Sequence, residues 1–198
     1  MTAEVNIRRP LAPSWRGTFR PAAGLPLRLM RMTHAPAVTF EALFPDVVPP
    51  ARATHGSAGY DARAYVRGRT IKRSDGARVW ETSQDVEDTV IIGPRETAMI
   101  PLGFKASVPS GYEAQVRIRS SVAFRKLLIV PNSPGTIDAD YPDEWMVLVH
   151  NTGAAPASVE HGERIAQIII ARFEIVSWMA GTVSVSTRSG GVGSTGRF

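Results

Sequence analysis

The sequence contains no cysteine, and this absence removes several classes of site. Without thiols the chain forms no disulfide, no thiolate nucleophile and no cysteine-ligated zinc or iron–sulfur centre. It also lacks any apolar run near the ~18 residues of a membrane-spanning helix. The longest apolar pieces are as short as Leu127–Val130 and Ile168–Ile170. We therefore expect a soluble, cytoplasmic protein with no membrane partner.

An excess of positive charge is missing from most of the chain, although the whole carries a formal net charge of +5. Residues 1–32 hold six arginines and a single acid, which equals the entire excess, and the remaining residues balance 17 bases against 17 acids. A nucleic-acid partner is not expected, because a basic binding patch would have to lie in that leader.

The leader, residues 1–34, has no sustained periodicity and carries prolines at positions 10, 13, 21 and 26. This composition predicts a disordered basic segment. Met30 and Met32 offer later start codons. Our hypothesis is that translation begins near Met32, so that residues 1–31 are not translated; mass spectrometry of the native N-terminus tests it.

Long helical stripes are also missing between residues 37 and 176, where short β-type runs alternate with glycine and proline. This pattern predicts an all-β sandwich or barrel of jelly-roll type. Residues 112–119 show the clearest strand, because Ala114, Val116 and Ile118 alternate with polar residues. Further strands are expected at residues 89–92, 97–101, 145–150 and 164–173.

Two segments stand apart from this β pattern. Residues 66–88 are charged, and Ser74-Asp75-Gly76 is typical of a hairpin tip with Trp80 on the returning arm, so we predict a surface hairpin insertion. Residues 186–198 contain four glycines and little apolar content, which predicts a mobile C-terminal tail.

The common catalytic patterns are absent as well. The four histidines are widely scattered, and no glycine-rich loop with a following lysine is present. Two segments remain as candidates. Residues 134–141 lead from a turn into two acids and a tyrosine, which alone is compatible with an ordinary β-hairpin. Arg119-Ser120-Ser121 offers groups that hold phosphate oxygens, although a strand end with a capping serine would look the same.

Taken in order, five segments resemble the five motifs of the trimeric dUTPase family. The resemblance covers roughly residues 37–196 and is interrupted by the predicted insertion. The segments are residues 56–64 (GSAGYDARA), 119–121 (RSS), 132–141 (NSPGTIDADY), 162–167 (GERIAQ) and 188–196 (RSGGVGSTG).

The resemblance implies a jelly-roll or β-clip type distorted barrel at residues 35–185, assembled as a homotrimer with active sites at subunit interfaces. Residues 186–198 would form a closing lid. The implied reaction is Mg2+-dependent hydrolysis of dUTP to dUMP and pyrophosphate, which keeps uracil out of DNA and supplies dUMP for dTMP synthesis.

The resemblance also assigns roles to residues. Asp138 would be the general base that activates the attacking water. The uracil would be recognised by Asn132 and by the backbone around Thr136 and Ile137, with Tyr141 under the deoxyribose and Met146 lining the pocket. The phosphates would be held by Arg119, Ser120, Ser121 and Gln167. Asp61 would hold Mg2+ through its water shell, and Arg164 would form a structural ion pair.

The tail departs from the family pattern. It has one residue fewer before the second glycine pair, and Val192 stands where an aromatic ring usually stacks on uracil. Arg188, Gly193 and Ser194 would still contact the substrate, but we expect a weaker lid than usual.

Two alternatives share the expected fold. A dCTP deaminase would need a glutamate near Leu148, and a leucine shuttles no protons. A non-catalytic dUTP sensor would use the insertion as a docking surface.

Overall fold

The computed structural model describes residues 35–83 and 88–183. The predicted leader and most of the predicted lid therefore lie outside the described residues. The described part from Pro36 onward forms one compact unit.

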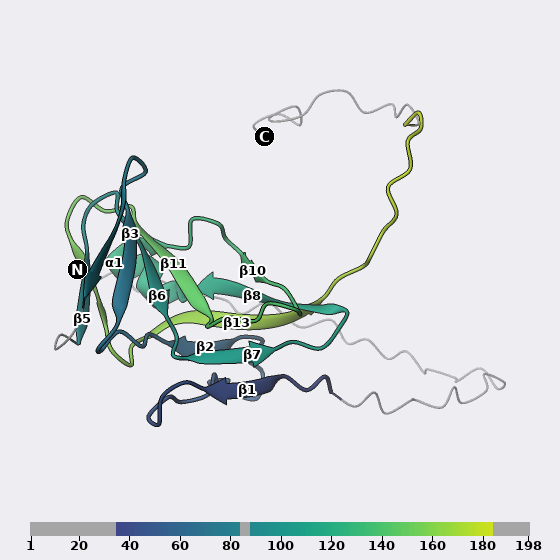
Figure 1. The fold of residues 1–198 in the computed structure, drawn as a ribbon, viewed down its shortest axis with the longest axis horizontal. Helices are drawn as coiled ribbons and strands as arrows, with labels where there is room; N and C mark the ends of the chain where they lie inside the picture. Colours follow the sequence, from purple (N-terminus) through teal and green to yellow (C-terminus); the bar gives the residue numbers. More distant parts are fainter. Residues whose placement is uncertain (1–34, 84–87, 184–198) are drawn as a thin grey trace, which may run out of the picture. The chain divides into compact units, whose positions relative to one another are not determined.

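Strands dominate this unit, and every paired strand runs antiparallel to its neighbour (Figure 1). In chain order the strands are β1 (Thr39–Ala42), β2 (Tyr60–Arg63), β3 (Thr70–Ser74), β4 (Val79–Ser83), β5 (Thr89–Ile92), β6 (Thr97–Pro101), β7 (Phe104–Ser107), β8 (Tyr112–Ile118), β9 (Leu128–Ile129), β10 (Gly135–Ile137), β11 (Met146–Asn151), β12 (Ala157–Glu160) and β13 (Arg164–Arg172).

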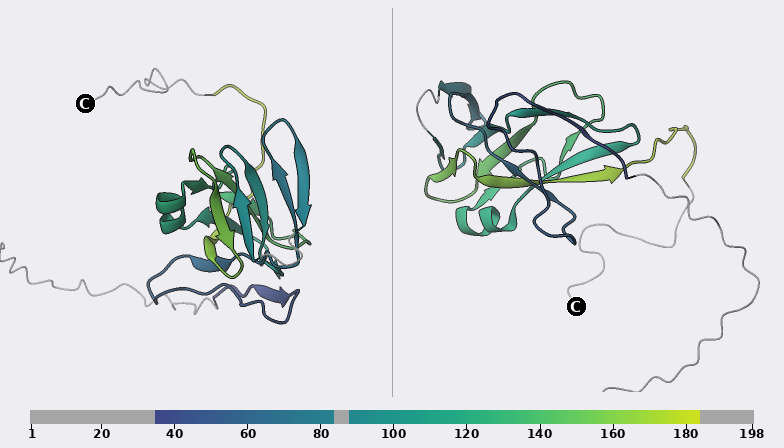
Figure 2. Two further views of the ribbon diagram at one scale, coloured as in Figure 1. Left: turned by 90° about the vertical axis from the view of Figure 1, so that its left-hand side faces the viewer. Right: turned by 90° about the horizontal axis from the view of Figure 1, so that it is seen from below.

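Two larger sheets carry most of these strands. One has the order β10-β8-β13-β2 and the other the order β4-β3-β6-β11-β9, and the pairs β1-β7 and β12-β5 complete the fold. Figure 2 shows the two larger sheets crossing rather than lying flat on one another. The all-β, jelly-roll class predicted from the sequence is confirmed.

The core forms where alternate residues of these strands face inward. In β8 the buried positions are Ala114 and Val116, and in β11 they are Val147 and Val149, as a period of two requires. Trp145, only 2% exposed, is the largest buried side chain and its ring lies 5.5 Å from that of Phe104.

The strands predicted from the sequence are found with small shifts. β5 and β6 have the predicted bounds, whereas β8 and β13 end one residue earlier and β11 begins and ends one residue later. The turns between them contain the predicted glycines, of which Gly111 has φ 81°.

The hairpin predicted within residues 66–88 is confirmed, with β3 paired to β4 from Thr70↔Ser83 to Ser74↔Val79. The prediction that it is a surface insertion is wrong for β3. This strand also pairs with β6, and its Ile71 is fully buried, so the first arm is an inner strand of the five-stranded sheet (Figure 2). Only β4 lies at the edge.

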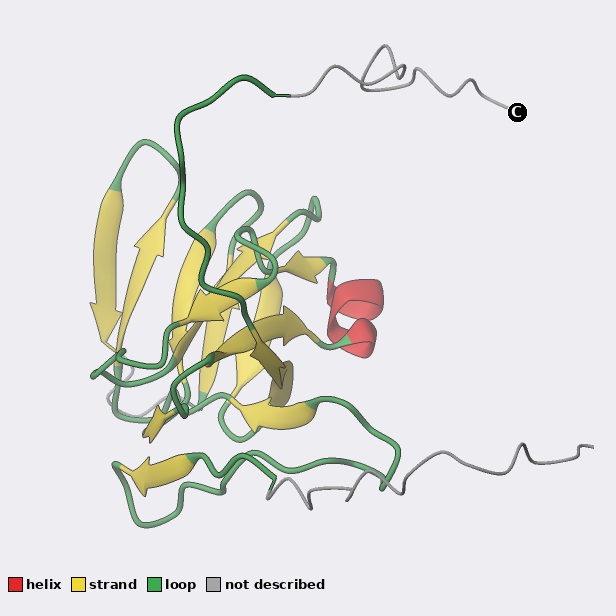
Figure 3. Cartoon of the chain, turned by 90° about the vertical axis from the view of Figure 1, so that its right-hand side faces the viewer, coloured by secondary structure: helices red, strands yellow, loops and turns green. Residues whose placement is uncertain are grey.

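A short helix, α1 (Ser120–Lys126), begins where the sequence predicted the end of a strand (Figure 3). Arg119 is its N-cap residue, with an extended backbone (φ −71°, ψ 140°). Val122 is the one buried residue of α1, so no apolar stripe announces the helix in the sequence. Leu127 adopts the left-handed conformation and ends it.

Residues 174–183 follow β13 without regular structure. Several large apolar side chains of this segment are exposed, among them Ile175, Trp178 and Met179 at 87%, 94% and 89%. Among residues 35–83 and 88–183, no helix is long and apolar enough to cross a membrane.

Candidate functional site

The carboxylate of Asp61 is the centre of a basic cluster. Asp61 lies on β2 and its side chain is 6% exposed. Its Oδ1 accepts hydrogen bonds from Arg119 Nε at 3.1 Å and from Gln167 Nε2 at 3.2 Å. Its Oδ2 accepts one from Arg164 Nη1 at 3.1 Å. We call these four residues the Asp61 cluster; the ion pair expected for Arg164 is confirmed.

The antiparallel register of the four-stranded sheet brings these residues together. β13 lies between β2 and β8, and Gln167 is opposite Asp61 on one side and Arg117 on the other. A register irregularity between Arg164 and Ala166 interrupts the β2 ladder. Arg119 follows β8 directly, and its backbone N–H donates to Ile165 O. Residues from three strands therefore meet at one sheet end.

Arg119 keeps unused hydrogen-bond donors in this arrangement. A guanidinium has five N–H donors. Arg119 uses Nε on Asp61 and Nη1 on the carbonyl oxygen of Arg164, at 3.2 Å. The remaining donors are available to an anion, and a fixed guanidinium suits phosphate oxygens.

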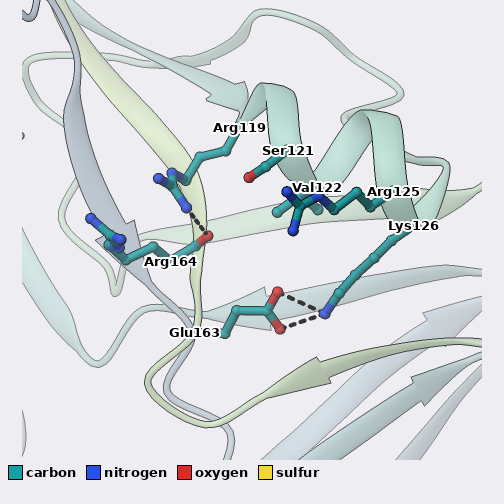
Figure 4. Close-up of a pocket in the computed structure, with 7 residues that line it drawn as sticks. All are labelled: Arg119, Ser121, Val122, Arg125, Lys126, Glu163 and Arg164. Carbon is teal, nitrogen blue, oxygen red and sulfur yellow. Dashed lines mark hydrogen bonds and ion pairs between the residues drawn. The ribbon is translucent and has the colours of Figure 1, made fainter.

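A pocket opens beside the cluster (Figure 4). It has a volume of about 290 Å³ and is lined by Arg119, Ser121, Val122, Arg125, Lys126, Glu163 and Arg164. Lys126 Nζ lies 2.7 and 2.8 Å from the two Glu163 carboxylate oxygens and donates to the Ser158 carbonyl at 2.9 Å. This ion pair joins α1 to the turn before β13. Ser120 and Ser121 are both exposed.

A second group of predicted residues lies on the hairpin around β10, and we call it the hairpin cluster. β10 pairs with β8, with Gly135 opposite Val116 and Ile137 opposite Ala114. Its members are the residues predicted for uracil, sugar and catalysis: Asn132, Thr136, Ile137, Asp138, Tyr141 and Met146.

Gly135 lets the Asn132 side chain approach the hairpin backbone. A Cβ on Gly135 would lie 3.5 Å from Asn132 Nδ2 and 3.8 Å from its Oδ1. Ile137 is buried, whereas Asn132, Thr136 and Asp138 are exposed. The side chain of Asp138 makes no hydrogen bond or ion pair within residues 35–83 and 88–183, and its carbonyl accepts the Tyr141 N–H at 3.2 Å. Tyr141 and Met146 are 41% and 36% exposed.

The structure thus separates the predicted site residues into two groups. Asp61, Arg119, Gln167 and, at the adjoining pocket, Ser121 come together. In the described part of the chain, no hydrogen bond or ion pair joins a side chain of the Asp61 cluster to one of the hairpin cluster. The predicted tail residues Arg188, Val192, Gly193 and Ser194 lie outside the described residues.

The donor set fits a hydrated metal ion and does not fit a direct protein cage. Among the described residues, no three His, Asp or Glu side chains are grouped as metal ligands. A carboxylate has about four lone-pair sites, and Asp61 already accepts three hydrogen bonds. One site remains on Oδ2, which suits a water molecule of a Mg2+ ion that keeps its hydration shell.

Sequence reasoning missed Arg125 and Lys126 as pocket residues. Ser121 and Arg125 are four residues apart, a spacing that shares a face only in a helix. Because residues 119–121 were expected to end a strand, that relationship was not visible. The helix itself leaves little signal, since it is seven residues long with one buried side chain.

Comparison with known proteins gives consistent results. The dUTPase family model matches residues 85–196. The deoxyuridine 5'-triphosphate nucleotidohydrolase of Solibacter usitatus (strain Ellin6076) is 44% identical over 113 residues, which cover 57% of this chain and 76% of the relative. The enzyme of the same name from Orientia tsutsugamushi (strain Boryong) is 40% identical over 129 residues, covering 65% of this chain and 74% of the relative.

Solved structures share the fold. The dUTPase of Staphylococcus bacteriophage 80alpha, solved with dUPNHPP, aligns with a TM-score of 0.61 and 23% identity over 81% of this chain and 98% of its own. The dUTPase of Streptococcus mutans aligns with a TM-score of 0.52 and 23% identity over 70% of this chain and 98% of its own. A phage phi11 dUTPase described for the coordination of a structural Mg(II) ion aligns at 0.59 and 19% identity over 76% and 99%.

Proposed function

Because this chain belongs to the dUTPase family and is a dUTP diphosphatase, we propose that it hydrolyses dUTP through a water activated by Asp138. The water oxygen bonds to the α-phosphorus, the bond from that phosphorus to the bridging oxygen breaks, and dUMP and pyrophosphate leave. The proton of the water passes to the Asp138 carboxylate. The product dUMP serves dTMP synthesis, and removal of dUTP keeps uracil out of DNA.

The observation that carries this proposal is the state of Asp138. It follows β10 directly, it is exposed, and none of its side-chain interactions within the described residues would compete for the proton. A general base must have a free lone pair within reach of the water. The turn hydrogen bond from Tyr141 to the Asp138 carbonyl holds the backbone at this point.

The hairpin cluster would select the base. The Asn132 amide above Gly135 can donate to and accept from a uracil edge, together with the backbone of Thr136 and Ile137. Such a site rejects cytosine, whose donor and acceptor are reversed, because buried polar groups would be left unpaired. Tyr141 would lie under the deoxyribose and exclude a 2′-hydroxyl, and Met146 would line the pocket.

The Asp61 cluster would hold the phosphate chain. Arg119, Ser120, Ser121 and Gln167 provide charge and donors, and from the tail Arg188, Val192, Gly193 and Ser194 would close over the substrate. When bound, Mg2+ supplies positive charge that stabilises the pyrophosphate leaving group. Asp61 would contact it through one water.

The separation of the two clusters supports a homotrimer. If base and phosphates of one dUTP contact different subunits, the clusters need not meet within one chain. The exposed apolar side chains of residues 173–183 also favour burial against another copy, since large exposed apolar surfaces mark interaction sites. Analytical ultracentrifugation of the full chain measures the oligomeric state.

Pyrophosphate release with Mg2+ tests the proposal, using dUTP, dCTP, dTTP and UTP in parallel. We expect release from dUTP alone and a loss of about 10²- to 10⁴-fold in kcat for Asp138→Asn. Asp140→Asn is the matched control, because this exposed acid lies two residues away and has no assigned role. Equal loss in both variants would refute Asp138 as the base.

The same assay separates the alternatives. Leu148 is half-buried on β11 opposite Met99 and carries no titratable group, which favours hydrolysis over deamination. Ammonia from dCTP would instead indicate a deaminase, and dUTP binding without any product would indicate a sensor.

A further inference from the structure

The pocket beside the Asp61 cluster holds more positive charge than the carboxylates around it neutralise. Its four cationic side chains face two acids, Asp61 and Glu163, which leaves a formal excess of two positive charges. The cations are Arg119, Arg125, Lys126 and Arg164. Like charges gathered in one pocket repel, so an excess of this kind favours an anionic ligand.

Three of these cations already have a carboxylate partner. Arg119 and Arg164 share Asp61, at 3.1 Å each. Lys126 is paired with Glu163 at 2.7 Å. Their charges are therefore partly neutralised within the protein, and their geometry is fixed by these contacts.

Arg125 differs from the other three. Within residues 35–83 and 88–183 its side chain has no hydrogen bond or ion pair, and it is exposed. It lies four residues after Ser121, and therefore on the same face of α1. Figure 4 shows its guanidinium turned back along the helix toward the Ser121 side of the pocket rather than out toward solvent.

We propose that Arg125 is a further ligand of the phosphate chain, an inference that rests on the proposed function for its physiological ligand. A polyphosphate held by Arg119 and Ser121 would extend along this face of α1. The Arg125 guanidinium would then donate two hydrogen bonds to non-bridging oxygens, the pairing that its planar fork favours. The ligand chemistry is a linear phosphate chain, shared by the substrate and by the pyrophosphate product.

Helix stabilisation alone would give Arg125 a different role. A cation in the last turn interacts favourably with the helix dipole, and Arg125 lies in that turn. That role requires no ligand and would affect the melting temperature without affecting anion affinity. Measuring both quantities in one set of variants separates the two roles.

The test is titration calorimetry of the full chain with inorganic tripolyphosphate, at two ionic strengths, together with melting temperatures. For Arg125→Gln we expect about a three- to tenfold higher Kd, as for the loss of an exposed charge-assisted hydrogen bond. Arg125→Lys should recover part of the affinity, because it keeps the charge and loses the fork. Arg78→Gln is the charge-matched control, since Arg78 pairs with Asp75 at the tip of the β3–β4 hairpin.

The outcomes are distinct. The inference is overturned if Arg125→Gln binds tripolyphosphate like the wild type, if the wild type does not bind it, or if Arg78→Gln weakens it equally. A lower melting temperature with an unchanged Kd also overturns it. A selective loss in Arg125→Gln supports it even when dUTP is not turned over, in which case only the proposed function fails. Turnover of dUTP with an unchanged tripolyphosphate Kd rejects Arg125 alone.

Discussion

Gln167 lies so close to Gly59 that the glycine has no space for a side chain. A Cβ on Gly59 would be 3.0 Å from Gln167 Cβ and 3.2 Å from its Cδ and Oε1. The Gln167 amide in turn donates to Asp61 at 3.2 Å. The backbone before β2 therefore supports one of the three donors that hold the Asp61 carboxylate.

Gly59→Ala should displace Gln167 and disturb the Asp61 cluster. Because the nearest atom is Gln167 Cβ, which is fixed to the β13 backbone, the side chain cannot simply turn away. We expect a destabilisation of about 1–3 kcal/mol, as for other overpacked positions, and a higher KM for dUTP. Gly56→Ala is the matched control, since nothing lies within 4 Å of a Cβ there. Equal effects in both variants would contradict this account.

Loss of Glu96 should destabilise the five-stranded sheet. Arg73, on β3, is 8% exposed; it pairs with Glu96 and donates to Ile91 O and Thr82 Oγ1, both at 2.7 Å. Glu96→Ala would leave this buried guanidinium without its acid. We expect a loss of about 2–4 kcal/mol in the free energy of unfolding, measured by urea denaturation.

Glu81→Ala controls for the removal of an acid from the same hairpin. Glu81 lies 3.9 Å from Lys72, and both side chains are more than half exposed. Such a pair contributes less than about 1 kcal/mol. If the two variants lost the same stability, burial of the Arg73 pair would not be the cause.

Tyr65→Phe should change how stability depends on pH. The Tyr65 hydroxyl donates to Asp46 Oδ1 at 2.8 Å, and this hydrogen bond lowers the pKa of Asp46 below 3.8. Burial and then the same bond raise the pKa of Tyr65 above 10.0. A lowered Asp46 pKa stabilises the fold above the unfolded value and loses that effect as pH falls through the folded value. The raised Tyr65 pKa acts below 10.0 and is lost as pH rises.

Unfolding of the wild type and Tyr65→Phe should thus differ at neutral pH and converge in acid, below the folded-state pKa of Asp46. Phenylalanine keeps the ring stacked on Phe44 at 4.5 Å, so packing is preserved. Tyr112→Phe is the control, because the Tyr112 hydroxyl accepts from Arg172 instead of donating to an acid. A stability difference for Tyr65→Phe that is the same at every pH would refute the linkage.

The strands were predictable because their signal is local. β5 and β6 are short apolar runs bounded by glycine and proline, and β8 alternates over seven residues. The position of β3 was not predictable. It places Arg73 inward, and an arginine there reads as a surface residue until its partner Glu96, 23 residues away, is known.

The candidate site was predictable in its residue types and not in its contacts. The resemblance identified Asp61, Arg119 and Gln167. Their meeting depends on partners 58 and 106 positions apart in the chain. No periodicity within one segment contains that information, because it arises from the register of β13 against two strands.

Asp61 also determines when the entropic cost of ordering the basic side chains falls due. A flexible arginine loses rotamer freedom whenever it is fixed. Since Asp61 holds Arg119 in the ligand-free chain, most of that loss occurs during folding, and an arriving anion meets a preorganised donor. Arg125 has no such partner among the described residues, so its ordering would be charged to binding itself. One pocket would thus combine a rigid arginine with one that adapts to the length of the anion.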